Sequence, residues 1–141
     1  MDILAAIKQD HKQIETLVSN LWHSDDVQKI YAYFNQLSEK LEAYINIKEQ
    51  VFYPVVRQNY PNGSELSATA EAKHRQIQQL LDDLENFSPT SDEFKQKTAE
   101  LQQSIQSFFA QEEKNIIQPA EMYLDEIQRQ KLGNEYKTAK S

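Results

Sequence analysis

Residues 30–55, IYAYFNQLSEKLEAYINIKEQVFYPV, decide the fold of this chain. Apolar residues recur in this stretch at alternating steps of three and four, which places their side chains on one face of a helix. The acidic residues just before it favour a helix start, and Pro54 predicts a kink or an end, because its ring clashes with the carbonyl four residues earlier. The inward face includes a lysine: Ile30, Phe34, Leu37, Leu41, Tyr44, Lys48, Val51 and Val55.

Three further segments have the same spacing and are separated by short polar connections near residues 23–26, 60–64 and 86–91. The first, about residues 2–22, directs inward Ile3, Ile7, His11, Ile14, Val18 and Leu21. The second begins near Ser64 or Ser67 and directs inward Ala70, His74, Ile77, Leu81 and Leu84. The third opens at Thr90, which has capping-box spacing to Glu93, and directs inward Leu101, Ile105, Phe108, Glu112 and Ile116.

Short connections force consecutive helices to be antiparallel neighbours, so we predict an all-α, up-down-up-down four-helix bundle forming one domain over residues 1–141. Only 2 Gly and 4 Pro are available for turns, which argues against a sandwich or barrel. After Pro119 the sequence predicts a short extra C-terminal helix that packs across one end of the bundle through Ile127, Leu132 and Tyr136, with Gly133 as its weak point.

Composition excludes several classes of function. The chain has no Cys, so disulfides, thiolate metal sites and thiol nucleophiles are excluded. A net charge of −7 with no basic block argues against nucleic acid as a partner, since phosphate binding needs clustered Lys and Arg. The sequence has neither a signal-peptide pattern nor about 20 consecutive apolar residues, so we expect no membrane partner and a cytoplasmic location.

A cluster of polar residues interrupts the four apolar faces: His11, Tyr44, Lys48, His74, and either Glu112 or Glu113. An unpaired charge in a dry core costs several kcal/mol, so these groups need partners. Each of them could be satisfied separately, by a core hydrogen bond or by a lysine reaching the surface. Alternatively, because helix bundles build metal and cofactor sites from facing helices, the residues could form one site.

Four local sequences carry a resemblance to a known family. They are IKQDH at 7–11, INIKEQVFYP at 45–54, AKH at 72–74 with the Ile77 and Leu80–Leu81 that follow, and EEKNIIQPA at 112–120. In this order and at these separations they resemble the hemerythrin-like family, also called HHE cation-binding domains, over nearly the whole chain. The resemblance implies a four-helix bundle and a pair of non-heme irons.

The resemblance also implies a set of iron-ligand positions. His11, His74 and Glu112 or Glu113 match metal-ligand positions of the family. The family's helix-two His and Glu fall on Tyr44 and Lys48, the first helix-three His on Ala70, and the helix-four His on Phe108. Alanine and phenylalanine cannot coordinate a metal, and lysine is an ammonium at neutral pH. We therefore expect the di-iron site, and ordinary O2 binding, to be lost.

Lys48 suggests what replaced the metal. A cation at the position of the family's bridging carboxylate allows an ion pair with Glu112 or Glu113. Our hypothesis is that this pair lies inside the bundle, with Tyr44, His11 and His74 completing a hydrogen-bonded network and no di-iron centre.

Several functions remain compatible with this sequence. The first is a cofactor-binding or sensing protein, in which His11 and His74 ligate a heme beside Tyr44, or in which these three residues and a glutamate hold a single iron. The second is a metal-free interaction or scaffold bundle, because aromatic residues in excess of packing needs suit a homodimer or partner surface: Trp22, Tyr31, Tyr33, Tyr53 and Tyr60. Enzymatic acid–base chemistry by Lys48 and Tyr44 is a third option. A small ligand in the bundle core also remains open.

Overall fold

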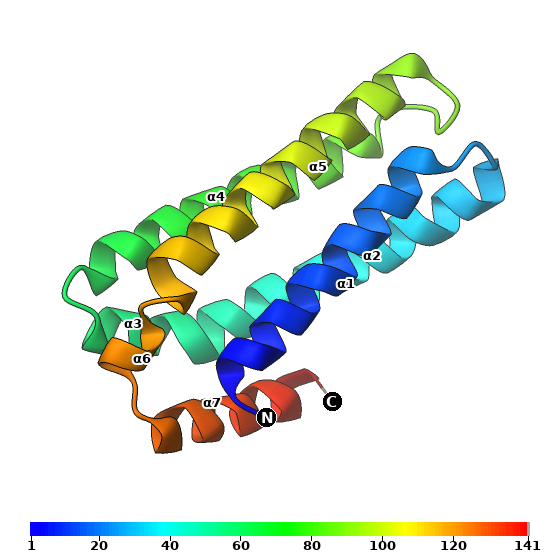
Figure 1. The fold of residues 1–141 in the computed structure, drawn as a ribbon. Helices are drawn as coiled ribbons and strands as arrows, with labels where there is room; N and C mark the ends of the chain where they lie inside the picture. Colours follow the sequence, from blue (N-terminus) through cyan, green and yellow to red (C-terminus); the bar gives the residue numbers. More distant parts are fainter. Residues whose placement is uncertain (141) are drawn as a thin grey trace.

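The computed structural model describes residues 1–140 and is helical in every regular element of that range (Figure 1). Four long helices form the bundle: α1 (Ile3–His23), α2 (Val27–Ile47), α4 (Gly63–Leu84) and α5 (Asp92–Glu112). α1 packs beside α2 and α4 beside α5, and α1 also packs on α5. The predicted all-α bundle is confirmed. The last residue of the predicted domain, Ser141, lies outside the described residues.

Short polar side chains start three of the long helices, as their sequences predict. The Asp2 carboxylate accepts a hydrogen bond from the Leu4 backbone N–H at 2.8 Å, and Asp26 caps α2 in the same way. The cap of α5 is Ser91, whose hydroxyl oxygen accepts from the Phe94 N–H at 3.1 Å. The prediction of a capping box at Thr90 was therefore wrong by one residue.

Two π-helical turns, η1 (Lys48–Phe52) and η2 (Glu113–Ile117), follow α2 and α5, and each ends two residues before a proline. The rings of Pro54 and Pro119 would clash with the carbonyls four residues earlier in a regular α-helix, and a wider turn relieves that clash. The short helices α3 (Tyr53–Asn59) and α6 (Ala120–Tyr123) continue beyond them. Pro54 therefore neither ends the helical path nor simply kinks it.

The extra residue in η1 changes which side chains after Lys48 face the core. One added residue rotates the following positions by about 100°. Phe52, Tyr53 and Val56 are consequently buried, whereas Val51 and Val55, which the regular spacing predicts as inward, are only partly buried. Tyr53 is thereby directed into the bundle.

The final helix, α7 (Glu126–Lys140), lies across the end of the bundle against α1 and η1, near both termini (Figure 1). The Arg129 side chain donates to Asp2 at 2.9 Å. The buried Asp10 carboxylate accepts from Lys40 at 2.9 Å, from Lys140 at 2.6 Å, and from the Tyr136 hydroxyl. Leu132 and Tyr136 are buried as predicted, but Ile127 is 82% exposed, so its predicted packing was wrong.

Gly133 is where α7 approaches the N-terminal backbone. A Cβ at this position would overlap the carbonyl oxygen of Met1 and lie 3.0 Å from the Ile3 nitrogen. The glycine therefore permits a close contact that no other residue allows.

We expect Gly133→Ala to lower the free energy of unfolding by about 1–3 kcal/mol, because the added methyl group overlaps the N-terminal backbone. This loss is expected even though alanine has a higher helix propensity than glycine, by about 1 kcal/mol. The exposed neighbour Asn134 supplies the control, because Asn134→Ala raises helix propensity without meeting the N-terminus. Chemical denaturation measures both variants, and amide hydrogen exchange should locate the loss in α7. Equal stability of the two variants would contradict the close contact.

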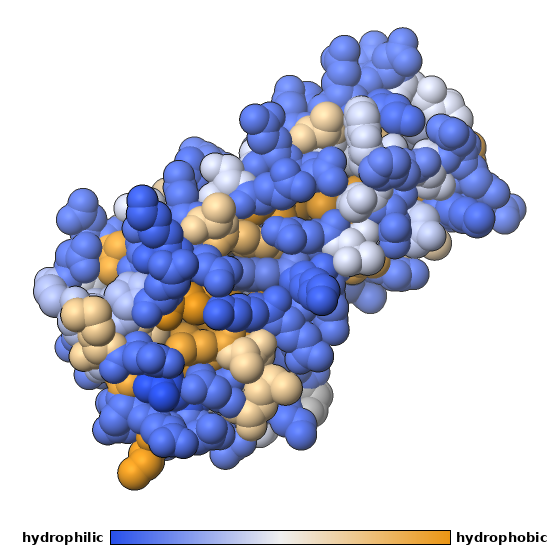
Figure 2. All heavy atoms as spheres, viewed as in Figure 1, coloured by the Kyte–Doolittle hydropathy of each residue, from blue (hydrophilic) through white to orange (hydrophobic). Residues whose placement is uncertain are grey.

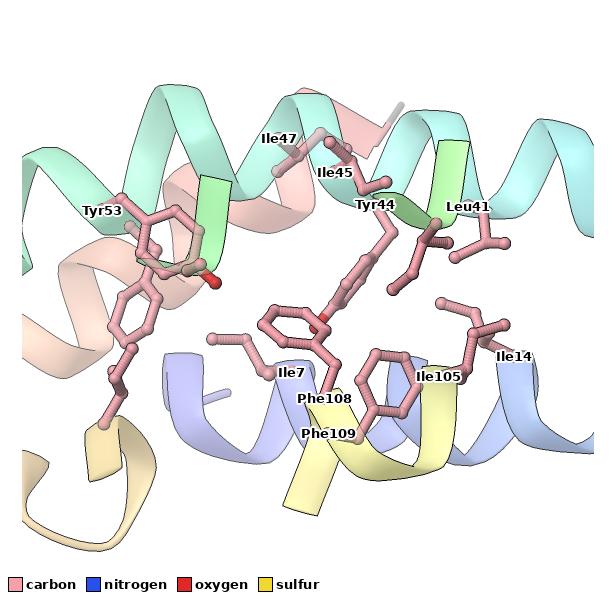
Figure 3. Packing of buried hydrophobic residues seen from close by; sticks show 14 of the residues in the cluster. Ile7, Ile14, Leu41, Tyr44, Ile45, Ile47, Tyr53, Ile105, Phe108 and Phe109 are labelled. Carbon is pink, nitrogen blue, oxygen red and sulfur yellow. The ribbon is translucent and has the colours of Figure 1, made fainter. Parts of the chain in front are cut away.

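Apolar side chains from all four long helices fill the interior (Figure 3). Tyr44 extends from α2 toward Phe108 and Phe109 on α5. The face in Figure 2 is largely hydrophilic, with apolar atoms gathered between the end of α5 and α7. Within the described residues, no helix has the length and apolar character needed to cross a bilayer.

Candidate functional site

The Glu112 carboxylate is the centre of a buried polar network. Glu112 is the last residue of α5, and its side chain has no exposed surface. One carboxylate oxygen accepts from His11 at 3.0 Å and from the Tyr44 hydroxyl at 3.2 Å. The other accepts from the Lys48 ammonium and from the Tyr53 hydroxyl. Four donors, one on α1 and three between residues 44 and 53, thus replace the water that this carboxylate loses on folding.

Lys48 supplies the positive charge of the network. Its side chain is fully buried, and its ammonium donates to the Tyr44 oxygen at 2.8 Å as well as to Glu112. The ammonium also lies 4.7 Å from the Tyr44 ring centroid and 5.0 Å from that of Tyr53, within the range of cation–π attraction. The predicted ion pair between Lys48 and a glutamate of the fourth long helix is present, and the glutamate is Glu112.

Within the pair, each charge opposes the effect of burial on its partner. Burial alone would raise the pKa of Glu112, but Lys48 and His11 hold it well below its usual value. Burial lowers the pKa of Lys48, and Glu112 opposes that change. Burial and the neighbouring Glu112 raise the pKa values of Tyr44 and Tyr53, so both remain hydroxyls. The Tyr44 hydroxyl is therefore a hydrogen-bond donor to Glu112 at neutral pH.

His11 joins the network from α1. Its Nε2 lies 2.5 Å from the Tyr44 oxygen and 3.0 Å from Glu112. Its ring stacks on Phe109, with centroids 3.8 Å apart and planes 12° apart. His11 Nε2 is thus already committed to the Glu112 carboxylate.

His74 is buried on α4 but does not join this network, contrary to our hypothesis. Its Nδ1 lies 2.9 Å from Glu49, which also accepts from Arg75. Burial alone would raise the pKa of Glu49, but Arg75 and His74 keep it low, so Glu49 is an anion that can only accept. Nδ1 therefore carries the proton, and in the neutral ring Nε2 is a bare lone pair. That buried Nε2 has no hydrogen-bond partner among the described residues.

Burial also lowers the pKa of His74 to about 4, and the nearby positive charge of Lys48 acts in the same direction. His74 is therefore neutral near pH 7. Its ring lies among aromatic neighbours, 5.1 Å from the centroid of Phe108 and 5.6 Å from that of Tyr53.

The structure corrects several assignments of core residues. Glu113 lies at the surface, where it pairs with Lys8 at 3.6 Å, so its placement in a metal site was wrong. Tyr53 and Tyr60 are buried, not surface aromatics. Ala70 and Phe108 are buried. The sequence pattern did not predict Tyr53 as a site residue, because the π-helical turn rotates its side chain into the bundle. The only sign of that turn in the sequence was Pro54, which follows Tyr53.

A pocket of about 210 Å³ opens between α4 and α5 next to this network. Its lining includes Ala70, Phe108 and Glu112. A polar mouth surrounds it, with Lys73 on α4 and two amides, Gln111 and Asn115, across the groove.

Comparison with known proteins places this architecture in a family. The profile described as Hemerythrin HHE cation binding domain matches residues 2–120. The chain belongs to the hemerythrin HHE family. α7 lies beyond the matched region, although it packs against the same end of the bundle.

A solved relative of this HHE domain has the same fold. It is a hemerythrin HHE cation binding domain-containing protein from Mycobacterium kansasii, with a TM-score of 0.85 and 19% sequence identity. The match covers 98% of this chain and 84% of that one.

A curated relative is more similar in sequence. A protein of Nostoc sp. named DNA nickase is 31% identical over all 141 residues. This chain spans 40% of the length of that protein.

The residues of this HHE domain do not fit a pair of irons. Within residues 1–140, no group of three or more His, Asp or Glu side chains is arranged to hold a metal ion. His74 Nε2 is a free donor atom, but the oxygens of Glu112 are shared among four hydrogen-bond donors. An ammonium in the same chamber repels a cation.

Proposed function

We propose that this chain is an HHE bundle in which the Lys48 ammonium takes the place of the bound cations. In this proposal the domain acts as a metal-independent sensing or interaction module and does not bind O2 at a di-iron centre. The observation that carries the proposal is the fully buried Lys48–Glu112 pair. A cation entering this chamber would have to break that pair and strand the Lys48 charge, which costs several kcal/mol.

The heme alternative has less support. An axial His11 would have to give up its bonds to Glu112 and Tyr44 and its stacking on Phe109. The Lys48 ammonium and the neighbouring aromatic rings contact one another at ordinary packing distances, so a heme in the interior would have to displace them. A single iron ligated by Tyr44 is disfavoured too, because the iron would have to displace the Lys48 ammonium and Glu112, to which the Tyr44 hydroxyl is hydrogen-bonded.

Nicking of DNA has no separate support on this chain. The name of the Nostoc relative concerns a longer protein. Here the net charge is −7, and the sequence has no block of Lys and Arg of the kind that phosphate binding needs.

Metal analysis tests the proposal directly. The full chain is incubated with ferrous iron and then desalted, and its iron content and visible spectrum are measured. We expect far less than one iron per chain, no charge-transfer colour, and no change in melting temperature after treatment with a chelator. A content of about two irons per chain, or a loss of stability on chelation, would overturn the proposal.

A matched variant serves as the positive control. It restores the donors that the family has at the four replaced positions: Tyr44→His, Lys48→Glu, Ala70→His and Phe108→His. These changes remove the internal ammonium and add three imidazoles, so we expect the folded variant to gain iron under the same conditions. Addition of hemin to the wild-type chain should produce no shifted Soret band, whereas a shifted band would favour the heme alternative.

A further inference from the structure

We infer that the pocket between α4 and α5 binds a small monocarboxylate with an apolar body. The inference extends the proposed function by naming a ligand class for the sensing module. It rests on that function, because metal-binding side chains at positions 70 and 108 would fill the space that the pocket occupies. The argument comes from the shape of the pocket, its charges and its size.

The inner wall of the pocket is apolar. Leu66 and Ala70 line it from α4, and Phe108 and Ile116 line it from the opposite side. Ala70 ends at Cβ, so the wall is hollow where a larger residue would fill it. Behind the wall, the Lys48 ammonium lies 5.7 Å from the Phe108 ring centroid. The ring therefore offers an apolar surface to a ligand, and Glu112 of the ion pair lines the pocket beside it.

The charge at the mouth favours an anion. Lys73 follows Ala70 by one turn of α4, is partly buried, and has neither an ion pair nor a hydrogen bond among the described residues. Glu65 also lines the pocket but is exposed, and it lies eight residues away along α4, about 12 Å. Glu112 is already neutralised by Lys48 and occupied by four donors. Lys73 is thus the one cation in the pocket lining, and within the described residues neither Lys73 nor the more distant Glu65 has a counter-ion.

A single ammonium suits a carboxylate better than a phosphate. A carboxylate forms one charge-assisted hydrogen bond with Lys73, and the amides of Gln111 and Asn115 lie across the groove for further hydrogen bonds. The pocket lining has no second cation to offset the second charge of a phosphate dianion. The ligand is therefore a monoanion.

The volume limits the ligand to a small molecule. A pocket of about 210 Å³ is below the range of roughly 300–1,000 Å³ that is usual for drug-sized ligands. A molecule of about ten non-hydrogen atoms suits it, and its expected Kd is on the order of 0.1–1 mM. Phenylacetate has this size and combines a carboxylate with an aromatic body.

Three probes with the same aromatic body and different head groups test the inference on the full-length wild-type chain. They are phenylacetate, its neutral analogue phenylacetamide, and the cation 2-phenylethylamine, each titrated against ¹⁵N-labelled protein by NMR. We expect phenylacetate to shift the backbone amide signals of α4 and α5 around the pocket. Its affinity should be about tenfold higher than that of phenylacetamide, and higher still relative to that of 2-phenylethylamine. Equal affinities, shifts elsewhere, or no binding at 10 mM would overturn it.

Two variants then assign the binding to the pocket. Lys73→Gln should reduce the affinity for phenylacetate to that of the amide, and Ala70→Leu should abolish binding by filling the hollow. Lys12→Gln, on a different groove beside α1, is the control and should bind as the wild type does. The comparison of head groups in the wild type does not depend on the folding of any variant. If the protein binds no iron and does not prefer the carboxylate probe, this inference alone is refuted. If the protein binds iron, the proposed function is refuted.

Discussion

Replacement of Lys48 by methionine should lower the free energy of unfolding by about 3–5 kcal/mol, because it leaves the Glu112 charge buried without its counter-ion. Methionine keeps most of the volume of the lysine side chain, so the cost reports the lost charge and not a cavity. The Glu112 side chain is fully buried and cannot turn toward water. Urea denaturation at pH 7, followed by circular dichroism, measures the change.

The same substitution at the surface is the matched control. Lys8 pairs at 3.6 Å with Glu113, the residue that follows Glu112, but the side chain of Lys8 is 53% exposed. Lys8→Met should therefore cost no more than about 0.5 kcal/mol.

A second variant separates the buried pair from general sensitivity of the site. Lys48→Met combined with Glu112→Leu removes both charges, and replacing a whole buried pair by apolar groups is often close to neutral. The double variant should therefore recover most of the stability lost in Lys48→Met. If Lys48→Met costs no more than Lys8→Met, the ion pair does not have the energetic role assigned to it.

Helical periodicity predicted the part of the site that lies on regular helix. His11, Tyr44, Lys48, His74 and Glu112 each occupy an inward position of a regular spacing, and each is buried. These inward positions needed only the 3.6-residue repeat. The pairing of Lys48 with Glu112 or Glu113 was a hypothesis that rested on the family resemblance and on the cost of an unpaired buried charge.

The rest depended on departures from that repeat and on contacts between distant segments. The π turn beginning at Lys48 rotates Tyr53 into the site, and the regular spacing contains no such turn. Asp10 is buried because α7 covers it and supplies Tyr136 and Lys140, which lie 126 and 130 residues further along the chain. The pairing of His74 with Glu49 required the relative height of two helices, which their separate patterns do not give.

His74 should make the protein less stable as the pH falls below the ordinary pKa of histidine. In the unfolded chain this histidine takes up a proton near pH 6.5, whereas in the folded protein its pKa is lowered to about 4. The unfolded state therefore binds more protons between these values, and acid favours it. The contribution of neutral His74 is fully present above pH 6.5, and we expect about 2 kcal/mol to be lost between pH 7 and pH 5.

The carboxylates act in a lower pH range and can be separated from this effect. The pKa values of Glu112 and Glu49 are lowered from the ordinary value of 4.5, so their contributions are present above that pH and decrease below it. Denaturation in urea at pH 7, 6 and 5 therefore samples mainly His74. His74→Gln keeps an N–H that can donate to Glu49 but has no proton to take up, so its stability should change little over this range.

His23 provides the matched control for this pH dependence. It is an exposed histidine at the end of α1, where its ring nitrogen lies 2.8 Å from the Ser19 carbonyl oxygen. His23→Gln should retain the wild-type slope of stability against pH, because it leaves the buried imidazole in place. A wild-type protein of constant stability between pH 7 and pH 5, or a His74→Gln variant with an unchanged slope, would show that His74 does not remain neutral in the folded state. The slope of stability against pH thus reports whether the buried His74 imidazole stays neutral next to Lys48.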